Sequence, residues 1–246
     1  LIGERGREIG DAVRRLSPAA RARTVIVAAR ADDPPLSWLE AADAATALAE
    51  GLRDQGKAVL LLVDSLTRVA RAVRTVGVAA GEPTTRRGFP PSLGPVLAGL
   101  VERAANRAGG GTLSAVYAVL TETDGVDDPV AEEARALLDG HWVLARARAE
   151  AGQFPAVDPV ASVSRCMADV VDAEHAAAAA TVRRRLAGLA RQADLHAVGA
   201  YRTGADPEAD AGLAQRDALA AFLRQGPADA VTFAETRAAL LALARG

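Results

Sequence analysis

The sequence predicts an α/β fold, in which a mostly parallel sheet is flanked by helices and followed by a small α-helical domain. Short apolar runs alternate with helical patterns in the first part of the chain. One run, Ala58–Val63, is apolar on both faces, as central strands of parallel sheets are. After Val170 strand-like runs stop while helical periodicity continues. We therefore expect one domain over residues 1–170, incomplete at its N-terminus, and a helical domain over residues 171–246.

The composition argues against several classes of protein. The 29 basic and 31 acidic residues nearly cancel, and only 3% of residues are aromatic, so nucleic acid is not an expected partner. No apolar run reaches the length of about 18 residues that a membrane span needs. Cys166 is the single cysteine, which excludes an intrachain disulfide and makes the cytoplasm the expected setting. The three histidines are scattered without a nearby cysteine, so a His/Cys metal cluster is not expected.

The chain begins like the end of a strand, Leu1–Glu4, which predicts that the sequence starts inside a domain. Ser37-Trp38-Leu39-Glu40 has the form of a capping box and predicts the start of a long helix. The strands and helices expected up to the central strand are a helix to about Leu16, a strand Thr24–Ala29, a helix Ser37–Gly56 and the strand Ala58–Val63.

Beyond the central strand the alternation continues as far as residue 144. We expect a helix Ser65–Gly77, a Gly/Pro-rich loop Ala80–Pro91, a helix to about Ala105, a strand Leu113–Leu120, an acidic loop Thr121–Asp128, a helix Pro129–Gly140 and a strand Trp142–Leu144. An irregular segment, Gly152–Pro159, follows. Residues 172–246 predict three or four helices broken at Gly199–Pro207 and Gly226–Pro227, with Arg183–Arg185 as a solvated helix face.

Four side chains have two possible roles each on local sequence alone. Asp64 ends the central strand, where open α/β sheets bind ligands, and is either a helix N-cap or a holder of Mg²⁺ and its water. Glu4, followed by Arg5, is either part of a charged, solvated helix start or a general base. Phe154 is either core or an apolar face for a nucleobase, and Arg165 is either a surface charge or a phosphate ligand.

Six motifs, in order, resemble the catalytic subunits of rotary ATPases, and most closely the type III secretion ATPases of injectisomes and of the flagellar export apparatus. They are G-E-R-G-R-E (3–8), L-L-L-V-D-S-L-T-R (60–68), A-A-G-E-P-T-T-R-R-G-F-P-P-S (79–92), L-D-G-H-W-V-L-A-R (138–146), F-P-A-V-D-P-V-A-S-V-S-R (154–165) and G-A-Y-R-T-G-A-D-P-E (199–208). The resemblance covers essentially the whole chain. Residues 85–89 lean toward the injectisome branch.

The resemblance implies a RecA-like, ATP-hydrolysing domain followed by a helical domain. It implies that Glu4 polarises the attacking water, that Arg5 lies near the γ-phosphate, and that Asp64 is the Walker B aspartate that holds the water shell of Mg²⁺. Phe154 matches the aromatic position that packs on adenine. Arg165 matches the arginine finger, which a homohexamer inserts into the neighbouring subunit's site, so ATP and Mg²⁺ are the implied substrate and cofactor.

The sequence departs from the family in two places. No G-x-x-x-x-G-K-[ST] occurs in the 246 residues, and the N-terminal β-barrel of the family is also missing. We therefore expect this polypeptide by itself to bind ATP poorly and hydrolyse little of it. The acidic loop 121–128 differs from the family's usual glycine–two-aspartate form, so no role is assigned to it.

Two functions follow from the resemblance. The first is a cytoplasmic hexameric ATPase that powers type III protein export and releases chaperones. Its implied partners are a central stalk, peripheral stator proteins, export chaperones and their substrates, and it would reach the inner membrane only through these partners. The second is a truncated or degenerate subunit that serves as a binding and assembly module without turning over ATP. A RecA-like motor on nucleic acid gains no support from the near-neutral charge.

Overall fold

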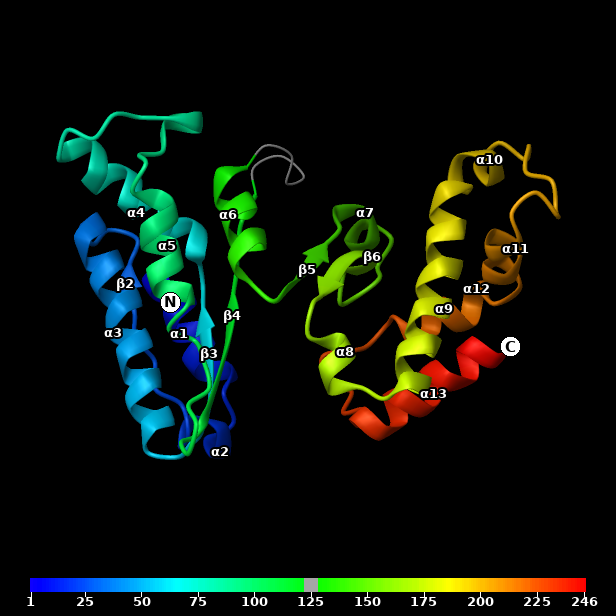
Figure 1. The fold of residues 1–246 in the computed structure, drawn as a ribbon, viewed down its shortest axis with the longest axis horizontal. Helices are drawn as coiled ribbons and strands as arrows, with labels where there is room; N and C mark the ends of the chain where they lie inside the picture. The colour runs from blue at the N-terminus through cyan, green and yellow to red at the C-terminus, as the bar shows by residue number, and fades with distance from the viewer. Residues whose placement is uncertain (122–127) are drawn as a thin grey trace. The chain divides into compact units, whose positions relative to one another are not determined.

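A computed structural model describes residues 1–121 and 128–246 (Figure 1). The chain forms two compact units, Leu1–Leu138 and Asp139–Gly246, and each is considered by itself. The predicted acidic loop lies, except for its two end residues, outside the described residues. The expected domain boundary near residue 170 stays a prediction.

The first unit contains two pairs of parallel strands. β1 (Ile2–Glu4) pairs with β2 (Ala29–Arg30), and β3 (Ala58–Val63) pairs with β4 (Thr112–Tyr117) in unbroken register. The backbone N–H of Ile2 donates to the carbonyl of Asp64 at 2.7 Å, which connects β1 to the residue just after β3. The mostly parallel α/β arrangement predicted from the alternating apolar runs is therefore confirmed.

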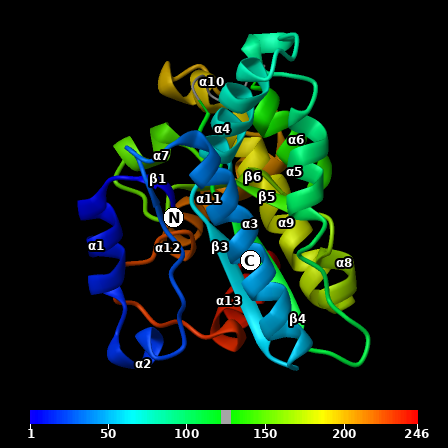
Figure 2. The ribbon, with the colours of Figure 1, turned by 90° about the vertical axis from the view of Figure 1, so that its left-hand side faces the viewer.

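Helices cover one face of the β3–β4 pair. In Figure 2, α3 runs along β3, and α3 also contacts α4. Leu61, Val63 and Leu113 point into the core on this face, together with Leu66 and Leu97 of the covering helices. The helices of this unit are α1 (Gly6–Arg15), α2 (Pro18–Arg21), α3 (Pro35–Asp54), α4 (Leu66–Ala79), α5 (Leu93–Val101) and α6 (Pro129–Leu137), with a short 3₁₀ helix η1 (Arg86–Gly88).

The opposite face of the same strands is open within the first unit. Leu60 and Leu62 are 62% and 63% exposed, and Val116 of β4 is 36% exposed. Because side chains alternate between the faces of a strand, the apolar run of β3 has one row of buried side chains and one row of solvent-exposed side chains. The run was predicted to be covered on both sides, and in the structure it is covered on one.

The strand before α3 and the start of α3 differ from those predicted. The expected strand Thr24–Ala29 is reduced to the two residues of β2, and residues 24–28 form no regular structure. The expected capping box at Ser37 is wrong, because α3 begins at Pro35 with Pro34 as its N-cap. Proline suits the first helical position since its fixed φ is already helical and its missing N–H has no partner to lose there.

The second unit starts with an antiparallel strand pair, β5 (Gly140–Leu144) and β6 (Val157–Ser164). β6 was not predicted, because Pro155 and Pro159 made this stretch look irregular. The structure places Pro159 at a local irregularity, where the Asp158 carboxylate accepts from the backbone N–H of Val160 at 2.9 Å. Proline is tolerated in a strand at such positions.

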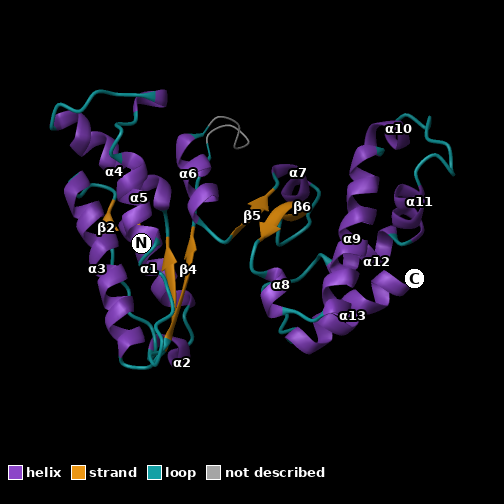
Figure 3. Ribbon diagram, viewed as in Figure 1, coloured by secondary structure: helices purple, strands orange, loops and turns teal. Residues whose placement is uncertain are grey.

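Helices form the remainder of the second unit (Figure 3). They are α7 (Arg146–Glu150), α8 (Met167–Val170), α9 (Ala173–Arg191), α10 (Ala193–Ala197), α11 (Pro207–Ala214), α12 (Arg216–Phe222) and α13 (Phe233–Arg245). Five of them follow residue 172, rather than three or four, and the two predicted breaks are confirmed. Their core is formed by buried side chains of α9, α12 and α13, namely Ala178, Val182, Leu186, Leu219 and Leu240.

The expected solvated face Arg183–Arg185 is only partly so. Arg185 is half-buried, and its guanidinium donates to the carbonyls of Leu243 and Ala244 at the end of α13. Arg183 is exposed but donates to two carbonyls of β6. These arginines therefore satisfy backbone carbonyls as well as facing water. None of the helices in the described ranges is long and apolar enough to cross a membrane.

Candidate functional site

The strand ends of the first unit bring two acidic residues to one edge. Glu4 is the last residue of β1, and Asp64 directly follows β3. The Ile2–Asp64 backbone hydrogen bond of 2.7 Å places these two strand ends side by side. The carboxyl ends of parallel strands are where open α/β sheets bind their ligands, so this edge is the candidate site.

Glu4 is held by an arginine from the following helix. Its side chain is only 14% exposed, and its Oε1 lies 3.2 Å from Nε of Arg68 on α4. The charges are in contact, but the Nε–H of Arg68 is buried and not aligned for a hydrogen bond. Arg68 therefore supplies a fixed positive charge beside Glu4.

The environment of Glu4 favours its protonated form. Burial is the main reason that its pKa is raised, the nearby Glu8 carboxyl raises it further, and Arg68 opposes both effects. The pKa of Glu8 moves the other way and is lowered, first by its hydrogen bond with Glu4 and then by the Arg5 backbone N–H, which donates to Glu8 at 3.2 Å. When this pair holds one proton, Glu4 carries it, because Glu4 is the less exposed carboxyl.

Asp64 is free of the capping role that was its alternative. The N-cap residue of α4 is Ser65, which is buried, whereas the Asp64 side chain is exposed. An exposed carboxylate at a strand end fits a magnesium ion held through its water shell, since Mg²⁺ keeps several waters and needs few protein ligands. Within the described ranges, no three His, Cys, Asp or Glu side chains are grouped to hold a metal directly.

The other two predicted site residues belong to the second unit. Phe154 is 56% exposed, so its interpretation as a core residue is wrong. It precedes a cis peptide bond to Pro155, and its carbonyl accepts from the backbone N–H of Gln225 at 2.8 Å. Arg165 follows β6 directly, with an exposed side chain and a backbone N–H that donates to the carbonyl of Asp139 at 2.7 Å. Both side chains can therefore reach a ligand or another molecule.

Sequence reasoning missed two residues at this edge. Arg68 lies four residues after Asp64, and Glu8 lies four residues after Glu4. Each lies in the first turn of the helix that follows a strand end, α4 and α1, and this position was the signal that could have assigned it to the same edge.

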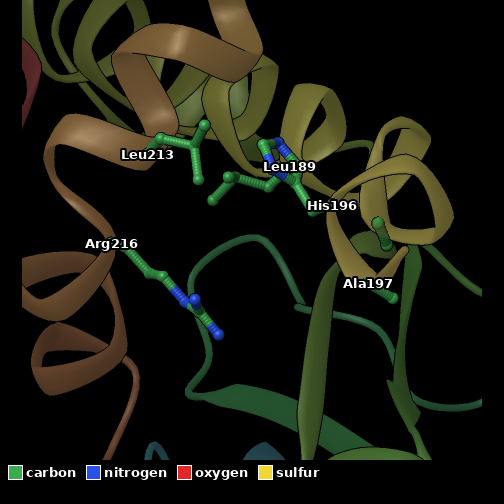
Figure 4. A pocket seen from close by; sticks show the side chains of 6 residues that line it. Leu189, His196, Ala197, Leu213 and Arg216 are labelled. Carbon is green, nitrogen blue, oxygen red and sulfur yellow. The ribbon is translucent and has the colours of Figure 1, made fainter. Parts of the chain in front are cut away.

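Two cavities lie away from these side chains. One of about 340 Å³ lies in the first unit and is lined by Phe89, several prolines and the ion pair of Arg86 with Glu132. The other, of about 350 Å³, lies in the second unit (Figure 4). It is lined by Leu189, Ala193, His196, Ala197, Leu213 and Arg216. Neither cavity contains a predicted site residue.

The chain matches the models of two known families. Residues 1–164 match the model of the ATP synthase alpha/beta family, nucleotide-binding domain. The chain belongs to this family. Residues 171–242 match a second model, the T3SS EscN ATPase C-terminal domain. The resemblance inferred from the six motifs is therefore confirmed.

Relatives come from both export systems. The flagellum-specific ATP synthase of Pseudomonas aeruginosa is 48% identical over 248 residues, which cover 100% of this chain and 55% of the relative. The type 3 secretion system ATPase of Pseudomonas syringae pv. tomato is 46% identical over 98% of this chain and 54% of its own length. The identities are nearly equal and leave the branch open, so the predicted lean toward the injectisome gains nothing. The chain spans about half the length of the curated relatives it matches.

Solved structures share the fold of this family member. The assembled ATPase EscN from the enteropathogenic E. coli type III secretion system superposes with a TM-score of 0.93 at 43% identity, covering 99% of this chain and 59% of EscN. EscN in complex with its central stalk EscO matches with a TM-score of 0.89 at 41% identity, covering 99% of this chain and 58% of EscN. The predicted fold class, a RecA-like sheet followed by a helical domain, is therefore confirmed.

Proposed function

We propose that this chain carries the catalytic carboxylate and the metal-binding aspartate of an ATPase that energises type III protein export. The observation that carries the proposal is the pairing of two strand ends, which brings Glu4 and Asp64 to one edge with Arg68 fixed on Glu4. Phosphoryl transfer to water needs a group that orients the water and positive charge that neutralises the phosphate oxygens. At this edge, Glu4 can orient the water, and Asp64 can bind the cation that provides the positive charge.

Each residue at the edge has a separate task in the proposal. Glu4 polarises the attacking water, for which it must be ionised, and Arg68 offsets the effect of burial on its charge. Asp64 would hold the water shell of Mg²⁺, which would neutralise charge on the phosphates of ATP. Arg5, exposed at the start of α1, lies close to the γ-phosphate.

Residues of the second unit complete the site across two subunits. Arg165 acts as an arginine finger in the neighbouring subunit of a homohexamer, and Phe154 packs on the adenine. Their exposure supports these roles. Such a trans arginine is worth about 10³–10⁵ in rate in related enzymes. That EscN has been solved as an assembled ATPase supports a ring here also.

The proposed partners follow those of the relatives. EscN has been solved with its central stalk EscO, which supports a stalk partner for this chain. We propose in addition stator proteins, export chaperones and substrates as partners, action in the cytoplasm, and attachment to the inner membrane through partners only. We also propose that the chain divides into domains at residues 1–170 and 171–246, which the two matched ranges, 1–164 and 171–242, support.

The alternative function applies to a full-length protein that lacks the phosphate-binding loop. The 246 residues contain no phosphate-binding G-x-x-x-x-G-K-[ST] sequence. A subunit without that loop would occupy a ring, or dock chaperones through its helical domain, as a binding and assembly module that does not hydrolyse ATP.

The experiment that separates the two is phosphate release by a hybrid protein. Residues 1–246 replace the matching part of the flagellum-specific ATP synthase of P. aeruginosa, which then supplies the rest of the hybrid. The hybrid, its Glu4→Gln and Arg165→Ala variants, and an equal mixture of the two variants are compared with the unmodified relative. The chain by itself is measured in parallel and is expected to release little phosphate.

We expect the hybrid to hydrolyse ATP. The hydrolysis rate of each variant should be lower by a factor of at least about 10³, and the mixture of variants should recover part of the lost rate. Recovery requires interfaces that pair an intact Glu4 with a neighbour's intact Arg165. A mixture that co-assembles but stays inactive would show that Arg165 does not act in trans. An inactive, assembled hybrid beside an active relative would favour the binding module.

A further inference from the structure

The backbone of Gly3 lies against two side chains, those of Arg68 and Trp38. Gly3 adopts a φ of +66°, a conformation that other residues rarely adopt. A Cβ at this position would lie 2.8 Å from Cδ of Arg68 and 3.1 Å from the indole of Trp38. The aliphatic part of Arg68 and the indole of Trp38 therefore both lie against the residue that precedes Glu4.

One peptide group connects the Trp38 indole to the Glu4 backbone. The indole N–H donates to the carbonyl of Arg30 at 2.9 Å. The N–H of the same peptide group, which belongs to Ala31, donates to the carbonyl of Glu4 at 3.0 Å. The indole and the Glu4 backbone are thus hydrogen-bonded to opposite edges of one planar peptide group.

Arg68 needs an external restraint to stay where it is. An arginine side chain has several rotatable bonds, and its charged end is free to move unless packing or hydrogen bonds order it. The Nε–H of Arg68 lies 3.2 Å from Glu4 without the alignment of a hydrogen bond, so this contact orients it only loosely. The position of the stem over Gly3 offers a second restraint.

We propose that Trp38 is a positioning residue for the site, and that its ring, together with Gly3, holds the Arg68 guanidinium on the Glu4 carboxylate. The inference rests on the proposed role of Glu4 in hydrolysis, but its geometric content can be tested without nucleotide. Trp38 touches neither of the reacting groups and acts through Arg68. The N–H of the indole sets the orientation of the ring, and the ring provides the contact.

The test is the NMR signal of the Arg68 Nε–Hε group in the chain itself, assigned by its loss in Arg68→Lys. In the unmodified chain we expect a resolved, slowly exchanging signal that moves in Glu4→Gln. In Trp38→Leu we expect hydrogen exchange at this group to accelerate at least tenfold. Trp38→Phe, which keeps a ring but lacks the N–H, should retain most of the protection. Trp142→Leu is the matched control, because Trp142 lies in the second unit and is 73% exposed.

Each outcome decides the proposal. Far-ultraviolet circular dichroism and thermal unfolding establish that every variant compared is folded. An Arg68 signal that is unchanged in folded Trp38→Leu, or equal loss in Trp38→Phe and Trp38→Leu, overturns the ring contact. If Trp38→Leu does not fold, Gly3→Ala takes its place, since its Cβ pushes directly on Arg68, and an unchanged signal there also overturns the proposal. A protected signal beside an inactive hybrid would reject the proposed function and leave the positioning intact.

Discussion

At the scale of single residues, Glu4 makes folding depend on pH in a window of its own. Because burial raises its pKa, the folded chain binds the Glu4 proton more tightly than the unfolded chain does. The free energy of unfolding should therefore rise as pH falls from above the raised pKa toward the ordinary value of 4.5. The pKa values of Asp33, Asp54, Asp172 and Asp206 are lowered, so their contributions are lost only below about 3.8.

The expected result is that Glu4→Gln abolishes the rise in stability between pH 7 and 4.5 and leaves unchanged the part of the loss at lower pH that comes from the four aspartates. Urea unfolding followed by circular dichroism over this range measures it. Asp206→Asn is the opposite control, because Asp206 is held ionised by Arg191 and by the first turn of α11. Asp206→Asn should reduce only the loss in the free energy of unfolding below about pH 4. A rise that persists in Glu4→Gln would mean that another group takes up the proton.

At the scale of elements, close packing of α9 on α11 depends on a glycine. A Cβ at Gly188 would lie 2.6 Å from the backbone nitrogen of Ala209, and backbone cannot move aside as a flexible side chain can. We expect Gly188→Ala to destabilise the second unit by about 1–3 kcal/mol. Gly51→Ala in α3 is the matched control, because nothing lies within 4 Å of its Cβ.

In that exposed helix position alanine should stabilise by up to about 1 kcal/mol. Thermal unfolding of the two variants therefore gives changes of opposite sign. If Gly188→Ala were also stabilising, α9 and α11 would be farther apart than the structure has them.

Adjacent leucines of β3 provide a second prediction at this scale. Leu61 is 8% exposed and Leu62 is 63% exposed. Truncating Leu61 to alanine should cost about 2–5 kcal/mol, because it opens a cavity in the core. Truncating Leu62 should change stability by less than about 0.5 kcal/mol, while reducing the binding of a hydrophobic dye to the bare face. Denaturant unfolding and dye fluorescence check the pair, and equal destabilisation would mean that the face of Leu62 is covered in solution.

The strands and helices were predictable where local pattern and tertiary environment agree. The apolar run of β3 gave its limits without error, whereas β6 was missed because Pro159 reads as a breaker and only the antiparallel partner shows that the strand continues. The one-sided burial of β3 could not be predicted either. A run of leucines predicts an apolar strand, but whether other elements cover each of its faces depends on the rest of the fold.

At the scale of the whole molecule, the candidate site was predictable as a set of residue types but not as a geometry. The strand-end positions of Glu4 and Asp64 follow from the order of apolar runs. The Arg68 contact does not, because it depends on where α4 starts and on the packing of Trp38 over Gly3. Local sequence left two possible roles each for Phe154 and Arg165, their assignment to the site came only from the resemblance, and their roles stay predictions.

The two compact units also predict how the chain loses its structure. Each unit has its own buried cluster, with Leu97 fully buried in the first and Leu219 2% exposed in the second. Stability contributed by a core side chain is local unless the two cores unfold as one cooperative system. Leu97→Ala should therefore speed native-state hydrogen exchange in α4 and leave α9 little changed, and Leu219→Ala should do the reverse.

Peptide-resolved hydrogen exchange measures both helices in one experiment. The free energy of opening should fall by about 2–5 kcal/mol in the unit where the leucine is truncated. Leu62→Ala serves as the control, because it removes the same atoms from an exposed position. If either core variant accelerates exchange equally in α4 and α9, the units share one unfolding transition. Motion at the Glu4 edge would then be coupled energetically to the helical unit, and a partner bound there could influence the site without touching it.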